Sequence, residues 1–262
     1  MNRDLLKRSV CNIRMVIVVL LIVALFFNEY FITGNILYSG WKRFTTYDIA
    51  AMVTDVLSTS YFTIIAGMIP GIPYGFSLLE ERNSGFLRFQ LSRMSVNQYI
   101  GKKICYVGLS GGLSMVLPYF VLLIPVSLLG APTTEKVHYQ IMEGIVGAKT
   151  LYAWNGYFYI LLQGIVLFLF GITWAELSLL ISLYVRNRYL AFVMPVIIYH
   201  VWWLFGSTKG YWQYINPIHM ITYGYAEHKL VTHPFFVFGV YIILLSLFII
   251  ATFRKQVRNG KI

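Results

Sequence analysis

Residues 156–206 read GYFYILLQGIVLFLFGITWAELSLLISLYVRNRYLAFVMPVIIYHVWWLFG, and this stretch decides the class of fold. Two apolar runs, 156–185 and 189–206, flank the triplet Arg186-Asn187-Arg188. A helix that crosses the hydrocarbon core of a bilayer needs about 20 mostly apolar residues. We therefore predict a hairpin of two transmembrane helices. A single merged span would bury both arginines, at about 2.5–3.5 kcal/mol each near a helix centre.

The rest of the chain is also rich in apolar residues and poor in charged ones. Of its 262 residues, 58% are hydrophobic and 12% are charged, against about 45–50% and 25% in soluble domains. One core of a water-soluble protein cannot hide so much apolar surface, which excludes a soluble enzyme and a disordered chain. We expect one domain over 1–262, an all-α polytopic membrane protein with six transmembrane helices. The four further spans are predicted at 13–33, 52–75, 104–129 and 234–253.

The net charge of +11 would suggest a nucleic-acid partner in a soluble protein, but here its distribution matters more. Six spans place both termini on one side of the membrane. Of the 21 Lys and Arg residues, 15 fall on the side of the termini and 6 on the other. Basic residues accumulate on the cytoplasmic side, so we expect cytoplasmic termini, a lipid bilayer as partner and no nucleic acid.

Two segments between the spans stand out. Segment 207–233 is too polar to cross but has apolar residues around Asn216-Pro217, so we expect a re-entrant or interfacial element. Residues 76–103 form the sizeable cytoplasmic loop and read FSLLEERNSGFLRFQLSRMSVNQYIGKK. We predict a short amphipathic helix over 86–91. The preceding Pro70-Gly71-Ile72-Pro73 is expected to bend the second span into this loop.

Glu80 and Glu81 form the one adjacent acidic pair of the chain and are followed by Arg82. Acidic residues do not help topology, and they face a negatively charged leaflet. A protein partner is therefore favoured over lipid. The alternative is a solvated turn with a local ion pair, worth about 0–1 kcal/mol.

The same loop resembles a known family. Glu81-Arg82-Asn83-Ser84-Gly85, together with Leu87, Ser95, Tyr99 and Gly101-Lys102, is similar to the cytoplasmic motif of the type-2 ABC (ABC-2) permeases. Asn216-Pro217 before the last span also resembles that family, and the six-span layout covers the whole chain. Two features depart from the pattern: Phe86 stands where Thr is usual, and the usual turn proline is missing.

The resemblance implies the membrane subunit of an ATP-driven exporter in the plasma membrane of a bacterium. Two such subunits, identical or different, would pair, and two copies of a separate ABC ATPase subunit would dock below them with ATP and Mg. The exported substrate would be hydrophobic or amphipathic: an antimicrobial peptide, a drug or a lipid. The residues implied in coupling to the ATPase are Glu80, Glu81, Arg82, Gly85, Phe86, Leu87 and Arg88.

We expect no enzymatic activity and no bound cofactor in this chain itself. A Walker A motif reads G-x-x-x-x-G-K-[ST], and the nearest fragment, Gly101-Lys102, is followed by Lys103. No cluster of metal ligands with helical spacing is present in the sequence either. The ATPase must therefore be a separate polypeptide.

Inside the predicted hairpin, Glu176 and His200 lie at nearly equal distances from the turn at Asn187. Their depths differ by about 3 Å, so we predict that they face each other and share a hydrogen bond or a proton. The alternative is a protonated structural carboxyl group bonded to a backbone carbonyl.

Two other classes of protein fit the sequence less well. An ion-coupled carrier or channel would need several intramembrane charges, and Glu176 is one candidate. A prenyl-protein-type intramembrane protease would need Glu-Glu-x-x-x-Arg, but Gly85 stands where that arginine should be. A rhomboid-type protease needs a Gly-x-Ser triplet, which Gly108-Leu109-Ser110 supplies, as such triplets often do by chance.

Overall fold

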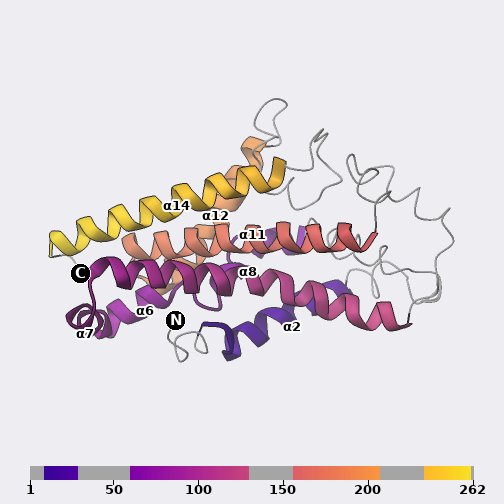
Figure 1. Cartoon of the computed structure of the whole chain (residues 1–262), viewed down its shortest axis with the longest axis horizontal. Helices are drawn as coiled ribbons and strands as arrows, with labels where there is room; N and C mark the ends of the chain where they lie inside the picture. Colours follow the sequence, from indigo (N-terminus) through magenta and orange to yellow (C-terminus); the bar gives the residue numbers. More distant parts are fainter. Residues whose placement is uncertain (1–8, 29–59, 130–155, 207–232, 261–262) are drawn as a thin grey trace.

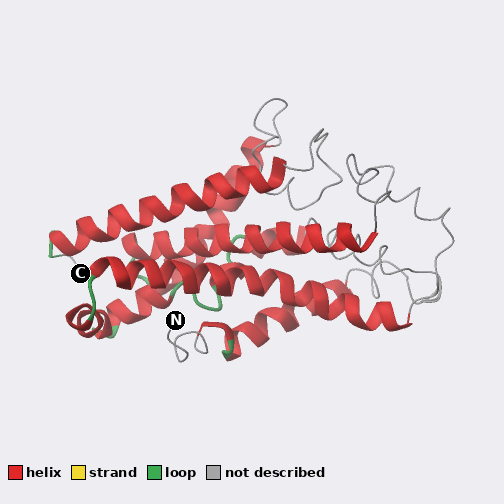
Figure 2. Ribbon diagram, in the orientation of Figure 1, coloured by secondary structure: helices red, strands yellow, loops and turns green. Residues whose placement is uncertain are grey.

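The computed structural model describes residues 9–28, 60–129, 156–206 and 233–260, which are helical and contain no strand (Figures 1 and 2). Three helices are long and apolar enough to cross a membrane: α8 (Val96–Leu129), α11 (Gly156–Tyr184) and α14 (His233–Arg258). Two shorter apolar helices, α2 (Ile13–Phe27) and α12 (Arg188–Gly206), accompany them.

The helix positions agree with the predicted apolar segments in most places. α11 and α12 flank the basic triplet as expected for a hairpin. α8 begins at Val96, eight residues before the predicted span, and α14 continues to Arg258. α2 covers the first part of the predicted segment 13–33, whose end lies outside the described residues. Segment 207–232 also lies outside them.

The second predicted span, 52–75, is described only from Ser60 onward, and that part is not one regular helix. Within its described part, α5 (Ser60–Ile65) is followed by turns and by the 3-10 helix η3 (Ile69–Gly71). The predicted break at Pro70–Pro73 is confirmed, although it begins earlier in the chain. Proline has no N–H to continue a helix, which explains the interruption.

This irregular segment lies inside the bundle. Gly71 lies against Ser178 of α11, because a Cβ added at Gly71 would be 2.4 Å from the serine Oγ. Ser178 precedes Arg186 by eight residues, or about 12 Å of helix. Non-helical backbone at such depth needs polar partners within the protein. One is Asn12, whose Nδ2 donates to the Pro73 carbonyl at 3.1 Å.

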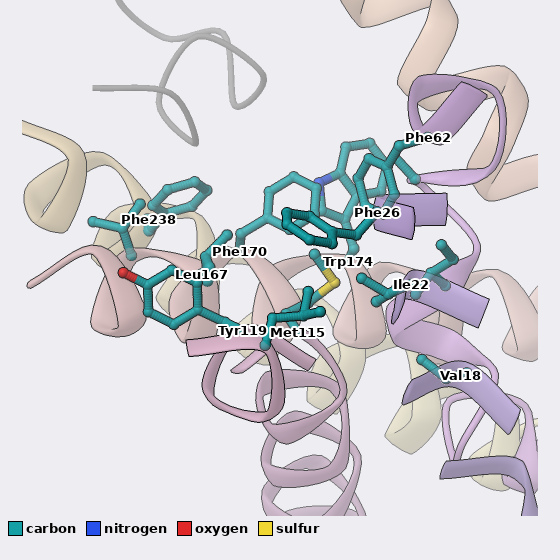
Figure 3. Close-up of a cluster of buried hydrophobic side chains, with 14 of the residues drawn as sticks. Val18, Ile22, Phe26, Phe62, Met115, Tyr119, Leu167, Phe170, Trp174 and Phe238 are labelled. Atoms are coloured by element: carbon teal, nitrogen blue, oxygen red, sulfur yellow. The ribbon is translucent and has the colours of Figure 1, made fainter. Parts of the chain in front are cut away.

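α11 lies at the centre and packs against α8, α14, α12 and η3. It approaches α8 closely, because a Cβ at Gly171 would lie 2.2 Å from the Gly111 carbonyl oxygen. Beside this crossing is a buried apolar cluster (Figure 3). Its members come from α2, α5, η3, α8, α11, α12 and α14 and include Val18, Ile22, Phe26, Phe62, Met115, Tyr119, Leu167, Phe170, Trp174, Tyr199 and Phe238.

Candidate functional site

Two short helices, α6 (Ser77–Asn83) and α7 (Phe86–Arg93), lead from the irregular segment to α8 at one end of the bundle (Figure 1). Gly85 joins them with φ of 74°, a left-handed conformation that favours glycine. α7 confirms the amphipathic helix predicted over 86–91 and extends it to Arg93. α6 was not predicted as a helix. We call residues 77–103 the loop module.

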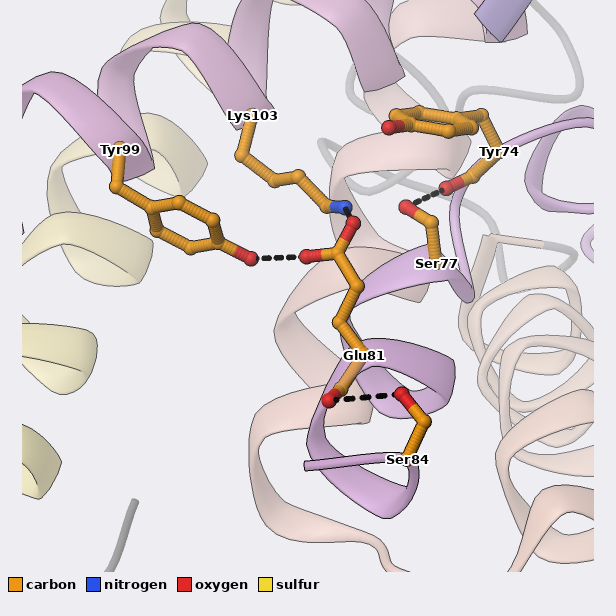
Figure 4. A network of polar contacts seen from close by, with 6 residues as sticks. All are labelled: Tyr74, Ser77, Glu81, Ser84, Tyr99 and Lys103. Atoms are coloured by element: carbon orange, nitrogen blue, oxygen red, sulfur yellow. Dashed lines mark hydrogen bonds and ion pairs between the residues drawn. The ribbon is translucent and has the colours of Figure 1, made fainter. Parts of the chain in front are cut away.

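Glu81 connects α6 to α8 (Figure 4). Lys103 Nζ donates to one carboxylate oxygen at 2.6 Å, and the Tyr99 hydroxyl donates to the other. Tyr99 and Lys103 are four residues apart and so lie on the same face of α8. The Lys103 side chain is 5% exposed and that of Glu81 is 19% exposed. The ion pair is therefore mostly shielded from water.

Glu80 connects α6 to α2. Its Oε1 accepts from Arg14 Nη2 at 2.7 Å, and both side chains remain partly exposed. A second contact between the same regions comes from Asn12, which bonds to Pro73. The Asn12 Oδ1 also accepts from the backbone N–H of Met15 at 2.8 Å and so caps α2. The start of α2 is thus joined to the segment that leads into the loop module.

Arg82 connects α6 to the end of α11. Its Nη1 donates to the Leu183 carbonyl at 3.0 Å and its Nη2 to the Val185 carbonyl at 2.7 Å. Carbonyl groups at a helix C-terminus carry partial negative charge, which suits a guanidinium. Burial, and secondarily the positive charge of Arg186, lower the pKa of Arg82. Three successive residues thus join α6 to three different parts of the bundle.

α7 has one buried and one exposed face. Leu87 is 1% exposed and packs into the bundle, whereas Phe86 and Phe89 are 40% and 48% exposed. Their ring centroids are 5.9 Å apart, and the Arg93 guanidinium lies 3.9 Å from the Phe89 centroid. Arg88 is also exposed. Paired exposed aromatic rings beside arginines are typical of a protein-docking surface.

Glu176 is buried in α11 but does not pair with His200. Its two carboxylate oxygens lie 3.2 and 3.1 Å from the Ser246 hydroxyl of α14. His200 Nδ1 instead contacts the Val196 carbonyl of its own helix at 2.8 Å. The predicted Glu176–His200 contact is therefore wrong. The reason is that α11 lies against α14 as well as α12, and the Glu176 side chain reaches α14.

No family model, curated protein or solved structure matches this chain. Within the described ranges, no group of three His, Cys, Asp or Glu residues could hold a metal ion. The loop module presents an aromatic and basic surface on α7 and holds α6 to α2, α8 and α11.

From the sequence, Glu80, Glu81 and Arg82 are predicted to contact a protein partner; in the structure each of them binds another part of the same chain. Sequence reasoning missed Asn12, Arg14, Lys103 and Ser246 as partners. Only Lys103 had a usable signal, because it follows Tyr99 by one helical turn at the entrance to α8. Nothing in the local sequence near Arg14 or Ser246 indicates a distant carboxylate.

Proposed function

We propose that this chain is the membrane permease subunit of an ATP-driven exporter, and that α7 is the surface on which a separate ATPase subunit docks. In this proposal the chain has six transmembrane helices with both termini in the cytoplasm. Two permease subunits pair in the plasma membrane of a bacterial cell. Two ATPase subunits, which bind ATP and Mg, attach from the cytoplasm.

The observation that carries this proposal is the connectivity of α6. A force applied to the exposed face of α7 passes through the Gly85 turn to α6. From there, Glu81 connects to α8, Glu80 to α2 and Arg82 to the end of α11. A docked motor could therefore displace several helices at once. A loop that merely linked two spans would not need ties to three of them.

The distribution of charge supports the proposed orientation. Every Lys and Arg in the described part of the chain lies at the end that carries the loop module. This end comprises the start of α2, the loop module, the α11–α12 turn and the end of α14. Arg254 near the end of α14 donates to the Asn97 side chain at 2.7 Å, which places these segments together. Basic residues favour the cytoplasmic side, where an ATPase would be.

The proposed cargo is a hydrophobic or amphipathic molecule such as an antimicrobial peptide, a drug or a lipid. This assignment follows from the resemblance of the loop to that of the ABC-2 permeases and from the apolar character of the bundle. The second permease subunit is either an identical chain or a different one.

Purification of the tagged full-length chain from its native membranes tests the proposal. We expect an ATPase subunit to co-purify and the eluate to hydrolyse ATP in the presence of Mg. Replacing both Phe86 and Phe89 by Ala should reduce the recovered ATPase by at least about tenfold, equivalent to about 1.4 kcal/mol. Because both rings are exposed, the fold should tolerate this change.

Phe236→Ala is the matched control, since Phe236 is 72% exposed on α14, away from the loop module. Its ATPase recovery should equal that of the unmodified chain. A complex without any nucleotide hydrolase, or equal recovery from the double variant, would contradict the proposal. Transport that persists without the ATPase but is lost in Glu176→Gln would instead favour an ion-coupled carrier.

A further inference from the structure

A groove of about 390 Å³ lies between α11, α12 and α14. This volume is within the range of about 300–1,000 Å³ that is typical of small-molecule sites. Its walls are apolar apart from the Thr173 hydroxyl and the polar atoms of Trp174, Trp202 and Tyr241. α11 contributes Trp174 and Leu177, α12 contributes Ile198 and Trp202, and α14 contributes Leu244 and Phe248.

The groove opens on a face that meets hydrocarbon if the chain is in a membrane. Leu244 and Phe248 line the groove and are 58% and 53% exposed. Ile243 and Leu247, beside them on α14, are 60% and 59% exposed. Among the residues that the structure describes, no charged side chain lines the groove. Its occupant therefore comes from an apolar surrounding rather than from water.

The depth of the groove along α14 also indicates an apolar surrounding. On α14 its lining runs from Tyr241 to Phe248, and Arg254 marks the start of the basic end. At 1.5 Å per residue, the groove extends from about 9 to 20 Å from Arg254. The hydrocarbon core of a bilayer is about 30 Å thick, so the groove would lie within it.

The apolar lining of the groove selects the kind of occupant. A non-helical peptide would bring N–H and C=O groups that these walls cannot satisfy. A hydrocarbon chain has no polar group to satisfy, and the surrounding bilayer supplies it. We infer that the groove between α11, α12 and α14 binds an acyl chain of a membrane lipid.

Photolabelling tests this inference. The full-length chain, with any subunits that co-purify, is reconstituted in vesicles of phosphatidylethanolamine and phosphatidylglycerol. A trace of phosphatidylcholine carries a diazirine in the middle of one acyl chain. After irradiation, adducts on the half-buried Leu177 and Ile198 should exceed those on the exposed Ile243 and Leu247 several-fold. Equal labelling of exposed and groove residues would overturn the inference, because it would describe ordinary contact with surrounding lipid.

A filling variant provides a second measurement. Leu245→Trp places a larger side chain in the groove and should reduce adducts on Leu177 and Ile198 several-fold. Ile243→Trp, two residues earlier on the exposed face, should leave them unchanged. Unchanged labelling in Leu245→Trp would overturn the inference. So would a photoreactive amino acid at position 245 that captures a protein segment, either residues 207–232 or another chain, in place of lipid.

The inference of a lipid-binding groove is independent of the proposed function. Loss of lipid labelling says nothing about ATPase recovery, which depends on α7. An exporter without a lipid-filled groove and a lipid-binding protein without an ATPase would be told apart by the two experiments.

Discussion

At the scale of single residues, the Glu81–Lys103 ion pair makes the sharpest prediction. Lys103→Met would leave the largely buried Glu81 carboxylate bonded to Tyr99 alone. Removing one partner of a buried pair costs about 3–5 kcal/mol. We expect about 3 kcal/mol, the lower limit, because Glu81 keeps some exposure. The measurement is the free energy of unfolding in detergent.

The neighbouring Lys102 is a matched control for this prediction. It is exposed, so Lys102→Met should change the free energy of unfolding by no more than about 0.5 kcal/mol. Adding Glu81→Gln to Lys103→Met should recover part of the loss, because the uncompensated charge is then removed. Equal effects of the two lysine substitutions would show that the pair is not shielded from water.

At the scale of helices, the prediction concerns the crossing of α8 and α11. In Gly171→Ala the new Cβ would lie 2.2 Å from the Gly111 carbonyl oxygen, so the two helices must separate. Overpacking of this kind costs about 1–3 kcal/mol. We expect a loss of about 2–3 kcal/mol, measured as the free energy of unfolding in detergent.

Gly164, on the same helix, is the control. Its added Cβ would meet Phe120 at 3.5 Å, an ordinary contact. Alanine also has a better helix propensity than glycine, by about 1 kcal/mol. Gly164→Ala should therefore be neutral or stabilising. A comparable loss in both variants would mean that helix propensity or flexibility, and not the close crossing, governs the α8–α11 contact.

At the scale of the whole molecule, the prediction concerns the side of the membrane on which the loop module lies. A single cysteine at Ser92, which is exposed on α7, should react with a membrane-impermeant maleimide only after the cells are opened. Cys11 and Cys105, both exposed, are first replaced by Ser. Ser207→Cys should react in intact cells if segment 207–233 lies outside, as the sequence predicts. Labelling of position 92 in intact cells would invert the orientation and remove the basis for an ATPase on this face.

The agreement between the sequence-based predictions and the structure varies along the chain for a physical reason. The apolar runs predicted the positions of α8, α11, α12 and α14, because burial in hydrocarbon needs a minimum length of uncharged helix. The break near Pro70 and the amphipathic α7 were also predicted, since proline and a short polar–apolar pattern act locally. α6 was not predicted, because its seven residues, Ser77–Asn83, are too few to show a helical period.

The partners of the charged residues could not be predicted in this way. Equal depth on a hairpin suggested His200 for Glu176, but depth does not specify which way a side chain points around its helix. The carboxylate turns to Ser246 of α14, a helix 70 residues away in the chain. Likewise, Arg14 reaches Glu80 across 66 residues.

The sequence by itself determined the helical class of this protein, the place where its second apolar segment breaks and the site of its amphipathic α7. These depend on side chains within a few turns of one another. The tertiary structure alone decided that Glu80, Glu81 and Arg82 join α6 to three parts of the bundle, and that a groove opens between α11, α12 and α14. Both depend on which helix faces are in contact, and that is set by close approaches such as Gly111 to Gly171, between residues far apart in the chain.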